Sequence, residues 1–440
     1  MGVIPLIYLI SGTILCIFFI ILIISSIRER KTRAAVISFI SFLVLCLVWY
    51  EGYVLLSFSD YFLMVPLVLV LFFVVLFFTP LGNVHTLHIG KVNKQVDERD
   101  VIFAREEYSH GTEKYKQYYQ LRPELKEIDD RIRDLPELLE PGGRYYDSVK
   151  SPMIDHIFDT IIEMTYRVDG PTNSKRIEMT PAEMTKKIKR LVLRLGADDV
   201  GIARLNPMWV YSHVGRGPEQ WGTPIENTHK YAIVFCIEMN YFQVEKAPTL
   251  PATEESASCY LEGSNISVSL AHYIRSLGYP ARAHVSGSNY QIMLPPVAHD
   301  AGLGELGRIG YLISPKFGAR IRLGAVTTDL PLVPDEPISF GVQDFCAKCK
   351  KCAINCPTGA IPKGEQKIVR GVKKWPLDIE KCLQYWRRTG SDCGLCMRVC
   401  PFSHPSTIAH NLVRAGLKRS PIARTLSVFG DDFLYGRKVL

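Results

Sequence analysis

Three long apolar runs open the chain. Residues 3–27, 34–57 and 61–82 carry almost no charge, and each run is long enough to cross a hydrocarbon core of about 30 Å as a helix. A removable signal peptide would supply one such run rather than three. A buried hairpin of a soluble fold is the alternative, but three consecutive runs favour a membrane. We therefore predict a three-helix transmembrane anchor over residues 1–83 that contacts membrane lipid.

The charges between these runs predict an orientation. The turn before the third run holds Asp60 and no base, whereas the turn between the first two runs holds Arg28, Arg30, Lys31 and Arg33. Basic loops stay on the cytoplasmic side of a membrane. We therefore expect a multi-pass protein of the cytoplasmic membrane, with its N-terminus outside and the catalytic domain facing the cytoplasm.

Mixed helix and strand patterns follow the apolar region. Residues 84–170 are charged, rich in tyrosine and irregular, which predicts a collar or linker with a helical stretch near 115–133. A helix start is complete at Thr180, with Pro181 at the first helical position and Glu183 three residues past the cap. A further helix is expected over 256–277, with strands over 231–237, 281–285, 290–294, 310–314 and 321–328. This alternation predicts an α/β layered domain over residues 171–342.

Two runs near the C-terminus contain most of the cysteines. The first run has the spacing Cys-x₂-Cys-x₂-Cys-x₃-Cys-Pro of bacterial ferredoxins, and the second ends in the same way after a longer first gap. In two-cluster ferredoxins the last cysteine of each run ligates the other cluster. The pattern therefore predicts two [4Fe–4S] clusters. One is assigned to Cys346, Cys349, Cys352 and Cys400, and the other to Cys356, Cys382, Cys393 and Cys396.

Other uses of these cysteines fit the sequence less well. Disulfide-dense chains are small and secreted, and paired zinc sites seldom end in x₃-Cys-Pro. We therefore expect a ferredoxin-like domain over residues 343–410, followed by a C-terminal tail over 411–440. The formal net charge of +8 comes from basic residues that are spread along the chain. Nucleic acid is accordingly not an expected partner.

A glycine-rich segment matches the G-x-G-x-x-G pattern through Gly302, Gly304 and Gly307. The match to a dinucleotide-binding turn is weak, because prolines precede it where a strand should run and Pro315 interrupts any following helix. The glycines would instead let the backbone approach a large flat ligand or neighbouring backbone closely. We count the three as candidate cofactor-binding residues on that ground.

From about residue 95 onward the chain resembles the corrinoid-dependent reductive dehalogenases and, more distantly, epoxyqueuosine reductases. Both cysteine runs carry the resemblance, together with the segments 256–260, 273–279, 300–308 and 332–341. The resemblance implies a nitroreductase-like domain that binds cobalamin. It also implies an oxidoreductase that removes halide from an organohalide, with electrons arriving through the two [4Fe–4S] clusters.

The resemblance also implies roles for single residues. Tyr260 falls at the position of the proton donor, Arg308 at that of a neighbouring cation, and Asn289 near an active-site amide. A phenol is a poor acid unless a cation stabilises its phenolate, which Arg308 would do. Trp386 would line the cofactor and substrate pocket or pack over a cluster. His299 is a possible proton relay, although a histidine with satisfied hydrogen bonds is the simpler reading.

Two other functions remain open from the sequence. An epoxyqueuosine reductase would share the cobalamin and the clusters, and a membrane electron-relay protein would use the clusters without catalysis. The electron donor would be a ferredoxin, a flavodoxin or a quinol-linked protein. Neither the organohalide, the lower cobalt ligand, the oligomeric state nor a respiratory or catabolic role follows from the residues.

Overall fold

A computed structural model describes residues 3–56, 60–80, 84–285 and 290–439 of the chain. Its contacts divide the chain into two compact units, neither of which is continuous in sequence. Unit 1 consists of Met1–Thr86, Ser339–Lys351 and His404–Leu440. Unit 2 consists of Leu87–Ile338 and Cys352–Ser403. The domain boundaries expected from the sequence stay a prediction.

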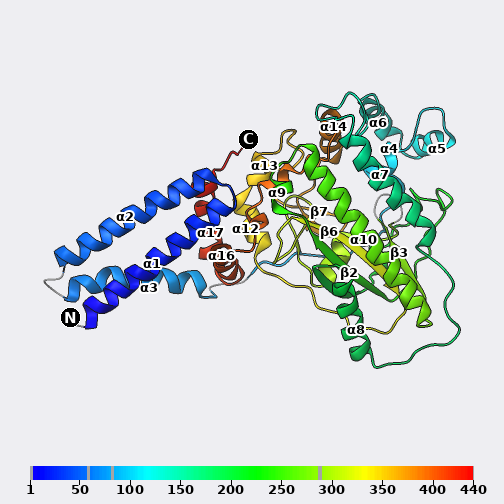
Figure 1. Cartoon of the computed structure of the whole chain (residues 1–440). Helices are drawn as coiled ribbons and strands as arrows, with labels where there is room; N and C mark the ends of the chain where they lie inside the picture. The colour runs from blue at the N-terminus through cyan, green and yellow to red at the C-terminus, as the bar shows by residue number, and fades with distance from the viewer. Residues whose placement is uncertain (1–2, 57–59, 81–83, 286–289, 440) are drawn as a thin grey trace. The chain divides into compact units, whose positions relative to one another are not determined.

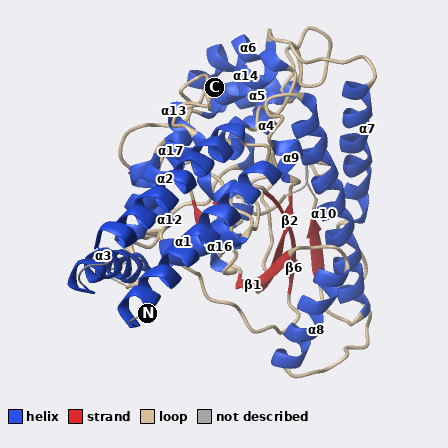
Figure 2. Ribbon diagram, turned by 60° about the vertical axis from the view of Figure 1, so that its left-hand side comes forward, coloured by secondary structure: helices blue, strands red, loops and turns tan. Residues whose placement is uncertain are grey.

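A four-stranded antiparallel sheet forms the centre of unit 2. Its order is β1-β2-β6-β3, with β1 (Asp199–Arg204), β2 (Tyr231–Glu238), β6 (Ile321–Thr328) and β3 (Ala281–His284). Figure 2 shows β1, β2 and β6 as neighbouring strands. β2 is apolar over nearly its whole length and its central residues are buried. Such a continuous apolar sequence is typical of a strand in a sheet that is covered on both faces.

Two helices cover the two faces of this sheet. Successive side chains of a strand point to opposite faces. Ala232, Val234 and Cys236 of β2 lie in one buried cluster with residues of α11 (Leu294–Asp300). The side chain of Ile237 points the other way and comes within contact distance of the Cβ position of Gly263 in α10 (Leu250–Ser276). The long helix α10 therefore lies along the opposite face, beside β6 and β3 (Figure 1).

Local signals in the sequence explain where α8 (Pro181–Arg194) begins. The Thr180 side chain accepts a hydrogen bond from the backbone N–H of Glu183, and its hydroxyl donates to the Glu183 carboxylate at 2.7 Å. This satisfies donors at the helix N-terminus that would otherwise lack partners. The helix start predicted at Thr180 is confirmed.

Other predicted elements differ from the structure. Residues 290–294 do not form a strand, since Ile292 makes one isolated bridge to Val210 and α11 begins at Leu294. Two prolines follow Leu294, and proline is favoured in the first turn of a helix. The strand β1, which follows α8, was not among the expected strands. Helix α10 begins six residues before its expected start at 256, at Leu250.

The glycine-rich segment belongs to a small hairpin of β4 (Glu305–Leu306) and β5 (Leu312–Ile313). A Cβ atom on Gly304 would lie 2.2 Å from the backbone oxygen of Ile313, and one on Gly302 would lie 2.6 Å from that of Glu336. A Cβ atom on Gly307 would lie 2.8 Å from the Ile313 side chain. Gly302 and Gly304 thus approach neighbouring backbone closely, which is one of the two alternatives given by the sequence, and Gly307 approaches a side chain. The cofactor-binding role of the three glycines stays a prediction.

The rest of unit 2 is built from short elements. The charged region forms α4 (Ile102–Glu106), α5 (Glu113–Leu121), α6 (Lys126–Arg133) and α7 (Lys150–Glu163), with 3-10 turns at Glu98–Asp100, Pro123–Leu125 and Met164–Arg167. A further 3-10 turn, Pro207–Trp209, and the one-turn helix α9 (Tyr241–Val244) flank β2. The cysteine region of this unit comprises β7 (Lys367–Val369), β8 (Val372–Lys374), α14 (Ile379–Thr389), α15 (Leu395–Arg398) and Pro401–Ser403. Helix α13 (Lys351–Ile354) begins at the last residue of a unit 1 segment.

Unit 1 contains the apolar helices α1 (Val3–Arg28), α2 (Thr32–Leu56) and α3 (Asp60–Phe78), which lie side by side in Figure 1. Within the same unit they contact α16 (Ile408–Arg419) and α17 (Pro421–Tyr435), and α12 (Val342–Cys349) contacts α17. Among the described residues, two helices have the length and composition to cross a membrane, Val3–Arg28 and Thr32–Val54. The apolar stretch of α3 whose side chains are described, Met64–Phe78, is shorter than the roughly 20 residues that a span needs. The expectation of three spanning helices is thus corrected to two.

Replacing Gly304 by Ala tests the packing role of this glycine. The new Cβ atom would meet the Ile313 backbone oxygen, so we expect the free energy of unfolding to fall by about 1–3 kcal/mol, as for an overpacked core. Chemical denaturation followed by circular dichroism measures the change. Gly364→Ala is the matched control, since nothing lies within 4 Å of its Cβ position. Equal stability of the two variants would contradict the packing role.

Candidate active site and cluster-binding cysteines

Tyr260 of α10 faces an arginine from the sheet. The guanidinium carbon of Arg322 lies 5.1 Å from the centroid of the Tyr260 ring, within the range of a cation–π contact. Arg322 stands opposite Ile237 in the ladder between β2 and β6, and paired residues share a face of the sheet. That face carries α10, so the pleat of β6 aims Arg322 at the tyrosine. The phenol therefore has the neighbouring cation that the sequence predicted, but from a different residue.

A buried carboxylate holds Arg322 in place. Asp392 accepts hydrogen bonds from the hydroxyls of Thr253 at 2.9 Å and Ser256 at 2.5 Å, both one or two turns before Tyr260 in α10. Arg322 donates to the Ser256 hydroxyl at 2.6 Å and lies 3.4 Å from the Asp392 carboxylate. Burial by itself lowers the pKa of Arg322, but the charges of Tyr260 and Asp392 raise it overall. The guanidinium is therefore a permanent cation beside the phenol.

The cysteines of one predicted cluster come together in unit 2. Burial raises the pKa of the Cys396 thiol well above its usual value, and the nearby charges of Cys393, Cys382 and Cys356 raise it further. The same neighbours act on Cys393, whose pKa burial and these charges raise to about 12. Four thiols this close resist ionisation together unless a cation is bound between them. The four cysteines that the sequence assigned to this cluster therefore lie near one another in unit 2, and their assignment to one cluster stays a prediction.

Hydrogen-bond donors surround the sulfur atoms of this set. Burial alone raises the pKa of Cys356, but backbone N–H groups of Ile361, Thr358 and Ala360 reverse this and lower it overall. The Trp386 side chain hydrogen-bonds Cys382 and opposes the effect of burial, which raises the pKa of that thiol to about 11. Donors to sulfur are among the features that tune iron–sulfur clusters. Trp386 thus lies beside a cysteine, as the cluster-packing alternative expects.

Tyr311 lies near both the cysteines and the pair of Tyr260 and Arg322. Burial raises the pKa of Tyr311 well above its usual value, the charges of Cys396, Cys382 and Tyr260 raise it further, and Arg322 lowers it. Tyr311 therefore lies within electrostatic range of both groups. Asp392, which lies 3.4 Å from Arg322, also directly precedes Cys393, so the Tyr260 and Arg322 pair and this cysteine lie in one region of unit 2.

The other predicted cluster set is divided between the units. Cys346 and Cys349 lie in α12 of unit 1, whereas Cys352 and Cys400 belong to unit 2. Cys400 contributes to the electrostatic environment of Cys396. The assignment of these four cysteines to one cluster stays a prediction.

Several candidate residues have other surroundings than expected. Arg308 is buried, donates to the backbone oxygens of Pro362 and Gly364, and stacks on Trp375 with its guanidinium 4.4 Å from the ring. These contacts hold the loop that follows β4, whereas the cation over Tyr260 is Arg322. The role expected for Arg308 stays a prediction, and Arg322 is a second candidate for it. Asn289 lies outside the described residues.

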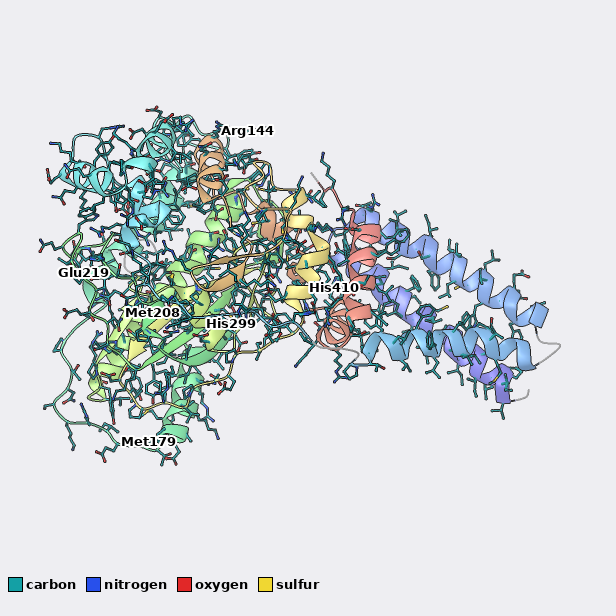
Figure 3. The ribbon with its side chains drawn as sticks, turned by 180° about the vertical axis from the view of Figure 1, so that it is seen from behind. Arg144, Met179, Met208, Glu219, His299 and His410 are labelled. Carbon is teal, nitrogen blue, oxygen red and sulfur yellow. The ribbon has the colours of Figure 1, made fainter. Side chains whose placement is uncertain are left out.

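His299, labelled in Figure 3, is buried and lies 2.9 Å through Nδ1 from the backbone oxygen of Gly304. This contact agrees with the reading of a histidine with satisfied hydrogen bonds. The residues that the sequence analysis missed are Arg322, Asp392 and Tyr311. Asp392 directly precedes a predicted cluster cysteine, and Arg322 lies within a predicted strand. These positions alone did not distinguish them from other polar residues.

Comparison with known proteins agrees with this geometry. A family model described as "4Fe-4S dicluster domain" matches residues 345–404. The tetrachloroethene reductive dehalogenase of Sulfurospirillum multivorans is 35% identical over 293 residues, which cover 59% of this chain and 58% of the relative. The chain is a homologue of the reductive dehalogenases. The tetrachloroethene reductive dehalogenase of Dehalobacter restrictus is 33% identical over 304 residues, 58% of this chain and 55% of that relative.

Solved structures of reductive dehalogenases also match. A catabolic reductive dehalogenase in complex with 3-bromo-4-hydroxybenzoic acid superposes with a TM-score of 0.67 at 29% identity, over 82% of this chain and 50% of that chain. The relation to epoxyqueuosine reductases is more distant, since the Bacillus anthracis enzyme is 32% identical over only 120 residues, 24% of this chain. The chain spans between half and three fifths of these reductive dehalogenases.

Replacing Arg322 by Met tests the buried network. Asp392 would lose its nearest cation, so we expect a cost of about 3–5 kcal/mol in the free energy of unfolding. Adding Asp392→Asn should recover much of this loss, because no unpaired charge then remains buried. Chemical denaturation of the single and double variants measures the coupling. Arg204→Met, at an exposed position of β1, is the control, and simple additivity of the two buried changes would contradict the coupling.

Proposed function

We propose that this protein is a corrinoid-dependent reductive dehalogenase. The reaction replaces the halogen of an organohalide by hydrogen, so it consumes two electrons and one proton and releases halide. The observation that carries the proposal is the Tyr260 and Arg322 pair beside a set of gathered cysteines. A proton source and an electron path would then meet in one site.

The cysteines would hold two [4Fe–4S] clusters, which pass single electrons. The set of Cys356, Cys382, Cys393 and Cys396 fits a cluster because its thiols are close together and donors from backbone and Trp386 reach its sulfur atoms. The second set, Cys346, Cys349, Cys352 and Cys400, is proposed from its spacing and from the match to the dicluster family. An external donor, a ferredoxin, flavodoxin or quinol-linked protein, would reduce them.

Cobalamin is proposed as the second cofactor. A solved relative whose title names B12-dependent dehalogenation matches over 81% of this chain with a TM-score of 0.66 at 28% identity. Tyr311, Arg322 and Cys396 are half-buried, so each keeps some surface that a bound ligand could contact. When bound, a corrinoid supplies the reducing metal that breaks the carbon–halogen bond.

Tyr260 would donate the proton through its phenolic oxygen. Loss of that proton leaves a phenolate, and the positive charge of Arg322 over the ring stabilises this anion. Asp392 and Ser256 fix the guanidinium, so the cation is in place before the proton moves. A protein that only relayed electrons would have no use for this pair, which favours the dehalogenase over the relay.

We also propose that the apolar helices α1 and α2 anchor the protein in a membrane. Their lengths and hydropathy suit two spans, and the basic turn between them would lie in the cytoplasm. Two crossings return the chain to the side of its N-terminus, whereas a crossing by α3 as well would place the following residues in the cytoplasm. The cytoplasmic orientation expected from the sequence therefore depends on α3, and the contacts of Glu29 in the basic turn with His404 and His410 favour that side.

Replacing Tyr260 by Phe tests the proton donor. The change removes only the hydroxyl, so we expect loss of dehalogenation by at least about 100-fold, the lower range for general acid catalysis. Halide release from a panel of organohalides measures turnover, and iron and corrinoid contents should stay unchanged. Tyr273→Phe is the matched control on the same helix, since Tyr273 is 41% exposed. Retained activity of Tyr260→Phe would show that another group donates the proton.

A further inference from the structure

A second group of potential metal ligands lies in unit 1, apart from the cysteines. Glu29 follows the end of α1 and is only 2% exposed. His404 precedes α16, and His410, labelled in Figure 3, lies in the first turn of that helix. One ligand atom from each of the three side chains lies within 4.8 Å of the other two.

The three side chains converge on the carboxylate. Glu29 Oε1 lies 2.6 Å from His410 Nε2, and Glu29 Oε2 lies 3.1 Å from His404 Nδ1. The two imidazole rings are stacked, with centroids 4.4 Å apart and planes within 9° of parallel. Both rings therefore present one nitrogen to the same carboxylate. Two imidazoles and one carboxylate are a ligand set typical of zinc and related divalent ions.

A further carboxylate orients one of the histidines. The other ring nitrogen of His404, Nε2, lies 3.4 Å from Asp431 Oδ1. Lys351 contacts the second oxygen of Asp431 at 2.5 Å, and both side chains are buried. Histidines that bind metals usually donate their remaining N–H to a carboxylate, which fixes the tautomer. An Nε2–H donated to Asp431 would leave Nδ1, which faces Glu29, as the ring nitrogen that binds a metal ion.

We propose that Glu29, His404 Nδ1 and His410 Nε2 bind a divalent ion of the zinc class, with Asp431 as a positioning residue. Three protein ligands leave a fourth position for water or another small ligand. The ion joins the end of α1 to the start of α16, two segments of unit 1 that are far apart in sequence. It is independent of the proposed dehalogenation and of the cysteine clusters.

Zinc content tests the site in the full chain, purified in detergent with its iron–sulfur clusters reconstituted. After incubation with Zn²⁺ and dialysis, we expect one zinc per chain, bound by nitrogen and oxygen at about 2.0–2.1 Å in X-ray absorption. Glu29→Gln and His410→Asn should lose this zinc at unchanged iron content. Asp431→Asn, which keeps the ligands, should weaken zinc binding by about 10–100-fold.

His156→Asn is the matched control, because His156 is 81% exposed on α7 and should leave zinc binding unchanged. Unchanged iron content shows that a variant is folded, and Asp431→Asn keeps the test valid if the ligand variants lose iron. Equal zinc content in the control and the ligand variants would overturn the proposal. So would sulfur scattering at about 2.3 Å, which indicates zinc on cysteines, or no retained zinc, which indicates a hydrogen-bonded array only.

Discussion

The contact between the Arg322 guanidinium and its buried neighbours joins the parts of the candidate active site. Arg322 lies on β6, Tyr260 and Ser256 lie on α10, and Asp392 precedes the cysteine Cys393. One cation thus contacts the sheet, the helix that covers it and the cysteine region. Leaving a buried charge unpaired is expensive, so any rearrangement of these three segments is strongly opposed. The same interaction therefore holds the proposed proton donor beside the proposed electron path.

The sequence predicted the elements whose signals are local. The Thr180 cap, the apolar strand β2 and the cysteine spacing each depend on residues close together in the chain, and each agrees with the structure or with the family match. Arg322 could not be chosen over Arg308 in this way. Which arginine faces Tyr260 depends on the pleat of β6 and on the helix that covers that face. Arg308 instead donates hydrogen bonds to two backbone oxygens and stacks on a tryptophan ring.

Two expectations were based on the length of an apolar run and on a letter pattern, and neither of these shows how the residues pack. The third apolar run contains enough apolar residues for a span, yet among the described side chains its apolar helix covers only Met64–Phe78. The G-x-G-x-x-G segment has the right letters, but its glycines allow contact with Ile313 and Glu336 within the chain. The first pattern overestimated the number of spans, and the second fits close approach to neighbouring residues, one of the two alternatives given by the sequence. The Glu29, His404 and His410 group is the opposite case, since ligands so far apart in sequence form no motif.

The most direct test of the central claim is the electron paramagnetic resonance spectrum of the anaerobically reconstituted full chain, recorded with its iron and cobalt contents. A site that joins clusters to a corrinoid near Tyr260 predicts two [4Fe–4S] signals, eight iron atoms and one corrinoid cobalt per chain. Titration with reductant should change the cluster and cobalt signals in the same sample. Protein that holds eight iron atoms but takes up no corrinoid would contradict the claim and indicate an electron relay.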